Sequence, residues 1–207
     1  LHGMLSRVTY NSTSGTNVYR DFVELPSQVM ENWAYEKEWL DKWAAHYETG
    51  EKIPAEYIAK IHDAANFQSG YQSDRQISFG LVDMAWHTVT GDIKESVPEF
   101  EQRAMSATET FPAVNSSCFS AGFGHIFGGG YAAGYYSYKW AEVLDADAFS
   151  VFKRNGIFNT VIADSFRKNI LEKGGSEHPM VLYKRFRGQE PQIDALLERS
   201  GLISSKK

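Results

Sequence analysis

The chain has 207 residues, of which 43% are hydrophobic, which is enough for one domain or for a large piece of a bigger one. The formal net charge is −5, and both signs are mixed along the sequence, which argues against a nucleic-acid-binding protein because that class presents a basic patch or stripe. The single cysteine excludes an internal disulfide, and no apolar run approaches the ~20 residues that span a bilayer.

Hydrophobic spacing is helical along most of the sequence. A helix is predicted from position 21 to about 47, with Pro26 either in its first turn or at a kink and with Gly50 as the stop. Seven further helices are predicted, over residues 54–66, 73–90, 95–108, 135–152, 158–173, 181–186 and 192–199. No window alternates as a solvent-facing strand does, so the sequence predicts an all-α fold, or one that is mostly so.

An acidic stripe lies in the first predicted helix, where Asp21, Glu24, Gln28 and Glu31 recur three or four residues apart. This spacing alone favours a solvated acidic face. The apolar residues and Trp33 around the stripe favour another interpretation, because a carboxylate among apolar neighbours needs a partner such as a metal ion or a base.

A glycine-rich segment, residues 122–134, holds six glycines in thirteen positions and cannot be regular structure throughout. His125 and the phenols of Tyr131, Tyr135 and Tyr138 lie on or just after it. A phenol can donate a hydrogen bond to a developing oxyanion, and Tyr135 and Tyr138 are expected to share a helix face. The burial habits of tyrosine alone favour an aromatic core segment that ends in a turn.

Other chemistry-bearing patterns are weak or missing. His2 is expected to be a satisfied or surface histidine. Cys118, seven residues before His125, is expected to be an inert buried thiol rather than a nucleophile. The sequence holds no Glu-x-x-His pair for a di-iron bundle, no Gly-x-Ser-x-Gly elbow and no Walker loop.

The acidic stripe and the glycine-rich segment together resemble the thimet-oligopeptidase family of zinc peptidases. In that family the third zinc ligand is a Glu in an Asp-Phe-Val-Glu-x-Pro-Ser-Gln context. The matching residue is Glu24, in the run Asp-Phe-Val-Glu-Leu-Pro-Ser-Gln at positions 21–28. By the same resemblance Asp21 either orients a zinc ligand through a hydrogen bond or has a structural or solvated role.

The family's glycine-rich loop and its tyrosines resemble residues 125–138. In the family this loop closes over the bound peptide, and its His and Tyr side chains hydrogen-bond the peptide backbone and the oxyanion. These roles would fall on His125, Tyr131, Tyr135 and Tyr138, with the oxyanion contact expected from Tyr131 or Tyr138.

The family's hallmark helix bears His-Glu-Phe-Gly-His, continued in many members as Ala-Leu-His-Gly, and His-Glu-x-x-His is absent from this sequence. That motif supplies two zinc ligands and the general base. The opening Leu1-His2-Gly3 resembles the end of the hallmark, so residues 1–207 are expected to be the C-terminal part of a catalytic domain without its upstream part. This piece alone is expected neither to retain zinc nor to cleave peptides.

The resemblance implies the C-terminal helical portion of a zincin-like, mostly helical, two-lobed peptidase with one Zn²⁺ ion in the complete enzyme. The runs at positions 14–17 (Ser-Gly-Thr-Asn) and 182–188 (Leu-Tyr-Lys-Arg-Phe-Arg-Gly) favour the bacterial peptidyl-dipeptidase, or dipeptidyl carboxypeptidase, branch, which releases C-terminal dipeptides from short peptides. The expected partners are short peptides and the absent N-terminal part of the same protein, with no nucleic acid and no membrane. The expected compartment is the cytoplasm, with the periplasm as the alternative.

Two alternatives stay open. One is an endo-acting oligopeptidase of the same family, which cuts inside short peptides and should accept a peptide with a blocked C-terminus. The other is a non-catalytic helical module that binds peptides or a partner chain through an aromatic groove.

Overall fold

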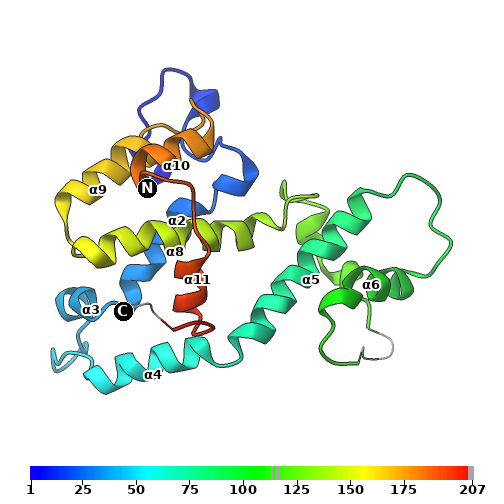
Figure 1. Cartoon of the computed structure of the whole chain (residues 1–207), viewed down its shortest axis with the longest axis horizontal. Coiled ribbons are helices and arrows are strands. Elements are labelled where there is room, and N and C mark those ends of the chain that lie inside the picture. Colours follow the sequence, from blue (N-terminus) through cyan, green and yellow to red (C-terminus); the bar gives the residue numbers. More distant parts are fainter. Residues whose placement is uncertain (113, 115–116, 205–207) are drawn as a thin grey trace. The chain divides into compact units, whose positions relative to one another are not determined.

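The computed structural model describes residues 1–112, 114 and 117–204 (Figure 1). Within these residues every regular element is a helix, and the one extended pairing is an isolated bridge between Ala45 and Lys52. The predicted all-α fold is confirmed. The chain divides into two compact units: unit 1 combines Leu1–Phe67 with the chain from Ala141 onward, and unit 2 is Gln68–Trp140.

Unit 1 is formed by helices from both ends of the chain. Its N-terminal stretch holds α1 (His2–Leu5), η1 (Asn11–Thr13), η2 (Arg20–Phe22), α2 (Leu25–Glu31), η3 (Asn32–Tyr35), α3 (Lys37–Trp43) and α4 (Ala55–Asn66). Its C-terminal stretch holds most of α8 (Ser137–Asn155), then α9 (Thr160–Phe166), the π-helix η6 (Arg167–Leu171), α10 (Pro179–Arg187) and α11 (Asp194–Arg199). η6 contacts α1, α9 and α10, while η3 contacts α2, α3 and α4.

The helix predicted from position 21 to 47 is broken into η2, α2, η3 and α3, so the prediction of one helix is wrong. Pro26 lies in the first turn of α2, where its missing N–H has no helical partner to lose. The break after η3 follows from Glu36, whose extended backbone (φ −88°, ψ 126°) cannot continue a helix. α3 ends because Ala44 is extended as well.

The other predicted helices exist, with shifted ends. The one predicted over 95–108 is α6 (Val97–Met105) followed by η4 (Ser106–Thr108), and the one predicted over 158–173 is α9 followed by η6. The helix predicted over 73–90 is α5 (Ser69–His87), which begins and ends earlier than its apolar spacing indicated.

Gly174 and Gly175, in the turn that follows η6, pass against the end of η1 and the loop between η1 and η2. The N–H of Gly175 donates to the carbonyl oxygen of Thr13 at 2.8 Å. An added Cβ would lie 2.2 Å from that same oxygen at Gly174, and 2.2 Å from the carbonyl oxygen of Asn17 at Gly175. Glycine is therefore required where the N-terminal and C-terminal stretches of unit 1 meet.

The core of unit 1 includes the place where η3 meets α8. Leu25 and Val29 of α2 are fully buried. Trp33 packs edge-on against Phe149 and Phe152, with ring centroids 4.7 and 4.9 Å away. This edge-to-face arrangement is one that aromatic rings prefer in protein cores.

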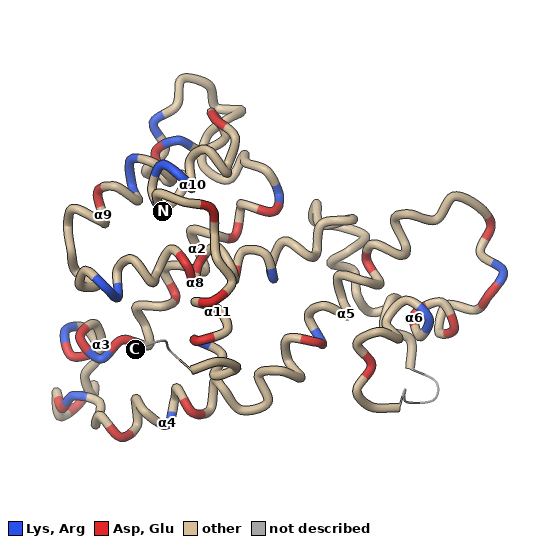
Figure 2. Tube along the Cα trace, in the orientation of Figure 1, with Lys and Arg blue, Asp and Glu red and all other residues tan. Residues whose placement is uncertain are grey.

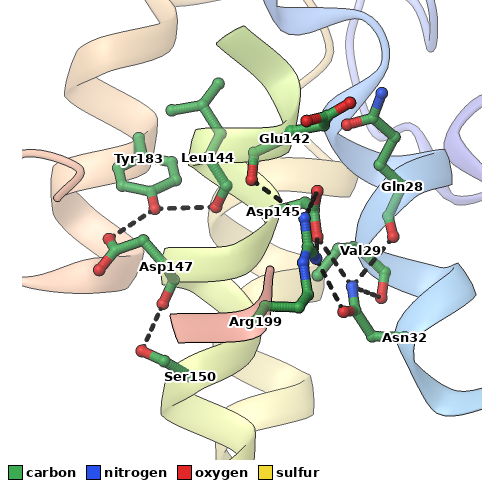
Figure 3. A network of polar contacts seen from close by, with 10 residues as sticks. All are labelled: Gln28, Val29, Asn32, Glu142, Leu144, Asp145, Asp147, Ser150, Tyr183 and Arg199. Atoms are coloured by element: carbon green, nitrogen blue, oxygen red, sulfur yellow. Dashed lines mark hydrogen bonds and ion pairs between the residues drawn. The ribbon is translucent and has the colours of Figure 1, made fainter. Parts of the chain in front are cut away.

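Asp145 of α8 ties α11 and η3 to the core of unit 1 (Figure 3). Its side chain is 2% exposed, yet it accepts hydrogen bonds from both Nη atoms of Arg199 and from Nδ2 of Asn32 at 2.8 Å. A buried carboxylate needs a paired charge and hydrogen-bond donors, and Asp145 has both.

Asp147, two residues after Asp145 on α8, holds α10 in the same way. It accepts from Oη of Tyr183 at 2.8 Å (Figure 3) and from Nε and Nη2 of Arg187 at 3.0 and 2.9 Å. Burial, with the Asp147 charge beside it, raises the pKa of Tyr183, so this phenol stays a donor. The C-terminal helices are thus anchored on two buried carboxylates of one helix.

Unit 2 is built on α5, against which α6 and η4 pack. It also contains α7 (Phe119–Gly122), η5 (Gly124–Ile126) and the first residues of α8. α6 begins with a capping box formed by Ser96 and Glu99. Glu101 is buried on α6 and accepts from the backbone N–H of Phe119 at 2.9 Å, which satisfies a donor at the start of α7.

Charged residues of both signs are interspersed along the described chain (Figure 2). None of the described helices combines the length and the apolar character that a bilayer crossing requires. The expected absence of nucleic-acid and membrane partners stays a prediction.

Candidate functional site

His125, Tyr131, Tyr135 and Tyr138, here called the aromatic cluster, lie together in unit 2. The His125 ring centroid lies 4.7 Å from that of Tyr131 and 5.6 Å from those of Tyr135 and Tyr138. Tyr131 stacks on Tyr138 at 5.0 Å, and Tyr135 lies 5.3 Å from Tyr138. His125 is exposed and the three tyrosines are half-buried, so the cluster is not the fully buried aromatic core that tyrosine burial habits favoured.

Three different segments bring the aromatic cluster together. His125 belongs to η5, Tyr131 and Tyr135 to the irregular chain that follows, and Tyr138 to the first turn of α8. The helix was predicted to begin at Tyr135, but it begins at Ser137, so Tyr135 and Tyr138 do not share a helix face. They meet in a turn, in which the backbone N–H of Tyr138 donates to the carbonyl oxygen of Tyr135 at 3.3 Å. The left-handed backbone at Gly129 (φ 70°) and Gly130 (φ 82°) lies before both of them, between His125 and Tyr131.

Two residues of α5 support the cluster, and neither was singled out from the sequence. Oη of Tyr135 donates to Oε1 of Gln76 at 3.1 Å. The carboxylate of Asp83 accepts from the backbone N–H groups of Ala133 and Tyr135. The signal that could have found them is their seven-residue spacing, which places both on one face of the predicted helix.

The aromatic cluster can hold and polarise a carbonyl group. Nε2 of His125 lies 3.0 Å from Oη of Tyr138, within hydrogen-bonding distance. Phenol and imidazole N–H or O–H groups that converge on half-exposed surface can donate to a peptide carbonyl or to an oxyanion derived from it. This arrangement agrees with the roles expected of the four residues, which stay predictions.

Glu24 lies in unit 1, directly before α2, with a half-buried side chain. The hydroxyl of Ser27 donates towards Oε2 of Glu24 at 3.1 Å and its carbonyl oxygen at 3.0 Å. Asp21 lies in η2 and Glu31 at the exposed end of α2, so the acidic stripe does not form one α-helical face as expected. The turn at η2 separates Asp21 from the residues that α2 carries.

A carboxylate such as that of Glu24 fits one position of a zinc site, because Asp and Glu oxygens are ordinary zinc ligands. Among residues 1–112, 114 and 117–204, no group of three or more His, Cys, Asp or Glu side chains could hold a metal ion.

His2 does not match its expected state. It is 6% exposed, and neither Nδ1 nor Nε2 has a hydrogen-bond partner, so it is neither satisfied nor on the surface. Burial, and secondly the charge of the N-terminus, lower the pKa of His2. Its position in the short helix α1, packed on η6, explains the burial.

Cys118 also differs from its expected state, because it is exposed rather than buried. It lies just before α7, with Sγ 3.6 Å from Oε1 of Glu101. The expectation of a buried thiol is therefore wrong, and the rejection of a Cys–His nucleophile stays a prediction.

Comparison with known proteins gives consistent matches over nearly the whole chain. A family model described as peptidase family M3 matches residues 1–202. Oligopeptidase A of Escherichia coli (strain K12) is 48% identical over 204 residues, which is 98% of this chain and 30% of that protein. Oligopeptidase A of Haemophilus influenzae is 45% identical over 206 residues, 99% of this chain and again 30% of the relative.

Dipeptidyl carboxypeptidases match as well. The protein of that name from Escherichia coli (strain K12) is 40% identical over 204 residues, covering 98% of this chain and 30% of the relative. The chain therefore spans about a third of the length of the curated relatives that it matches. Both names occur among relatives at similar identity, so the comparisons do not separate the two.

Proposed function

This chain belongs to peptidase family M3, and from that premise we propose that it is the C-terminal part of a zinc-dependent peptidase that hydrolyses short peptides. The observation that carries the proposal is the aromatic cluster, in which His125 and Tyr138 are hydrogen-bonded. The His-Glu-x-x-His helix that such an enzyme needs would lie outside these 207 residues, in the N-terminal part of the same protein.

Glu24 is proposed as one of three protein ligands of a single zinc ion, with two imidazoles of a His-Glu-x-x-His helix as the others. When bound, zinc would polarise the scissile carbonyl and lower the pKa of a water molecule. The hydrogen bond from Ser27 restrains the Glu24 carboxylate, and the fully buried Leu25 beside it fixes the backbone of this turn. Asp21 is proposed to orient a ligand by hydrogen bonding.

The aromatic cluster is proposed to bind the peptide and to stabilise the oxyanion. If the proton of His125 lies on Nε2, that N–H donates to Oη of Tyr138 and orients the phenol. Tyr131, stacked on Tyr138, presents a second phenol on the same side of the cluster. Tyr135 is held by Gln76 and is proposed to contact the peptide backbone.

Two product specificities remain. The motif runs at 14–17 and 182–188 favour release of C-terminal dipeptides. Cleavage inside short peptides stays the alternative, because relatives named oligopeptidase A, at 45 to 48% identity, and relatives named dipeptidyl carboxypeptidase, at 40 to 41%, match the chain similarly. A peptide with a blocked C-terminus separates the two, because a dipeptide-releasing enzyme fails on it and an endo-acting one does not.

The proposal is tested by the zinc content and peptidase activity of the complete protein with Glu24→Gln. Glu31→Gln is the matched control, because Glu31 is an exposed carboxylate at the other end of α2. We expect Glu24→Gln to lose zinc and activity while Glu31→Gln keeps both. An unsubstituted protein that binds no zinc, or a Glu24→Gln protein with full activity, contradicts the proposal, and absence of zinc favours the non-catalytic module.

A further inference from the structure

The carboxylate of Asp83 holds the backbone that lies between Tyr131 and Tyr138. Asp83 is on α5 and is 0% exposed. Its Oδ1 accepts from the N–H of Ala133 at 2.9 Å, and its Oδ2 accepts from the N–H of Tyr135 at 2.8 Å. One carboxylate thus bridges two backbone donors of the irregular chain that carries the phenols.

This chain segment needs an external restraint. Ala133 has φ 53°, a left-handed conformation that is unfavourable for any residue with a Cβ. Gly129 and Gly130 are left-handed too, and glycines do not resist relaxation to other conformations. The hydrogen bonds that the N–H groups of Ala133 and Tyr135 donate to Asp83 oppose that relaxation, together with the turn bond from the N–H of Gly134 to the carbonyl oxygen of Tyr131 at 2.9 Å.

His87, one helical turn beyond Asp83, fixes the carboxylate in turn. Its Nδ1 lies 2.9 Å from Oδ1 of Asp83 and 2.8 Å from the carbonyl oxygen of Asp83. Because both atoms are acceptors, Nδ1 must carry the proton. The His87 ring also lies near Phe127, with ring centroids 5.7 Å apart.

The same face of α5 contacts the irregular chain between Tyr131 and Tyr138 at two further positions. Gln76, seven residues before Asp83, accepts from Oη of Tyr135 at 3.1 Å. Gly80, between them, lies so close that an added Cβ would be 3.7 Å from Cα of Tyr136. The helix therefore supports both the backbone and one phenol of the aromatic cluster along its length.

We infer that Asp83 is a positioning residue for the proposed peptidase: through the backbone of Ala133 and Tyr135 it sets where the phenols of the aromatic cluster meet the substrate. The inference rests on the proposed function. Asp83 is fully buried and is not expected to touch the peptide. Misplacement of catalytic groups by about 1 Å can lower a rate by about 10²-fold, so an anchor of this kind matters to the reaction.

The anchor itself is tested by amide hydrogen exchange, measured by NMR on the full 207-residue chain. In the unsubstituted chain the N–H groups of Ala133 and Tyr135 should exchange at least about tenfold more slowly than unstructured amides. In Asp83→Asn one oxygen becomes an NH₂ donor, so at least one of the two amides should exchange about tenfold faster. If the N–H groups of Ala133 and Tyr135 exchange in the unsubstituted chain as fast as unstructured amides, the inference is overturned and no variant is needed.

The catalytic consequence is tested in the complete protein with Asp83→Asn. We expect kcat to fall by about 10- to 100-fold with KM and zinc content little changed. Asp145→Asn is the control, because Asp145 is an equally buried helical carboxylate that anchors α11 in unit 1. The kcat of Asp145→Asn should stay near that of the unsubstituted protein, even if its Tm falls as much as that of Asp83→Asn.

The outcomes separate the inference from the proposed function. Faster exchange in Asp83→Asn together with unchanged kcat overturns the inference alone. An equal loss of kcat in Asp145→Asn and Asp83→Asn also overturns it, because the effect is then one of general stability. An unsubstituted complete protein without peptidase activity overturns the proposed function and, with it, the positioning role.

Discussion

Nε2 of His125 lies 3.0 Å from Oη of Tyr138, although the two residues are thirteen positions apart and belong to different elements. The glycine-rich segment makes this contact, because its left-handed residues turn the chain back before α8 begins. The contact fixes the phenol at the start of a 19-residue helix, where it is better restrained than on a loop.

Removal of the Tyr138 hydroxyl should therefore affect the transition state more than binding. For Tyr138→Phe in the complete protein we predict a loss in kcat of about 10²-fold or more with a small change in KM, the effect typical of a lost oxyanion donor. Steady-state kinetics on a short peptide measure this. Tyr10→Phe, at an exposed phenol of unit 1, is the control and should leave kcat unchanged.

The sequence predicted the helical fold because its apolar spacing is local information that a helix uses directly. It did not predict the break at Glu36, because no Gly or Pro marks that position and the break depends on packing. Likewise, the predicted helix start at Tyr135 was wrong, since Tyr is compatible with either state and the N–H of Tyr135 donates to the carboxylate of Asp83. Helix ends are set by such tertiary contacts more than by propensity.

The four members of the aromatic cluster could be found from composition and resemblance, because a His and three phenols near glycines are a visible pattern. Their supports could not, since Asp83 reaches across fifty positions of sequence to Ala133. The unsatisfied state of His2 was equally hidden, because burial of a terminal helix depends on residues far along the chain.

His2 should make the stability of the 207-residue chain depend on pH. Its pKa is lowered from 6.5 in the folded state, so below about pH 6.5 the unfolded chain binds a proton that the folded chain does not. The free energy of unfolding should then fall as the pH drops, by at most ~1.4 kcal/mol per pH unit from this group. Urea unfolding at pH 7.5 and 5.5 measures how far the free energy of unfolding falls between the two pH values. This fall should be smaller for His2→Phe than for the unsubstituted chain, and an equal fall in both chains would contradict the prediction.

Breaking the Asp147 network should destabilise unit 1 strongly. Asp147→Ala leaves the guanidinium of Arg187 without this acceptor and leaves Oη of Tyr183 with the carbonyl oxygen of Leu144 alone, and we predict a loss of about 3–5 kcal/mol. Tyr183→Phe removes one hydrogen bond and should cost about 1–2 kcal/mol. Denaturant unfolding measures both; a loss for Asp147→Ala no larger than that for Tyr183→Phe would show that the ion pair contributes little.

Gly175→Ala should disturb the loop that precedes Glu24. The added Cβ would lie 2.2 Å from the carbonyl oxygen of Asn17, so the backbone must move, at a cost of about 2 kcal/mol or more. Gly3→Ala is the control, since its Cβ would meet nothing within 4 Å. Thermal unfolding should show a lower Tm for Gly175→Ala and an unchanged Tm for Gly3→Ala. An unchanged Tm for Gly175→Ala would mean that the N-terminal and C-terminal stretches of unit 1 are less closely packed.

The central claim is that Glu24 is a zinc ligand and that the aromatic cluster contacts the peptide, and diffraction from the complete protein at the zinc absorption edge tests both roles most directly. With a phosphonate peptide analogue bound, we predict an anomalous peak about 2.0–2.2 Å from a carboxylate oxygen of Glu24. A phenol oxygen of Tyr131 or Tyr138 should lie about 2.7–3.1 Å from the analogue's oxyanion. A zinc ion bound without Glu24, or an analogue that no member of the cluster contacts, would contradict the account.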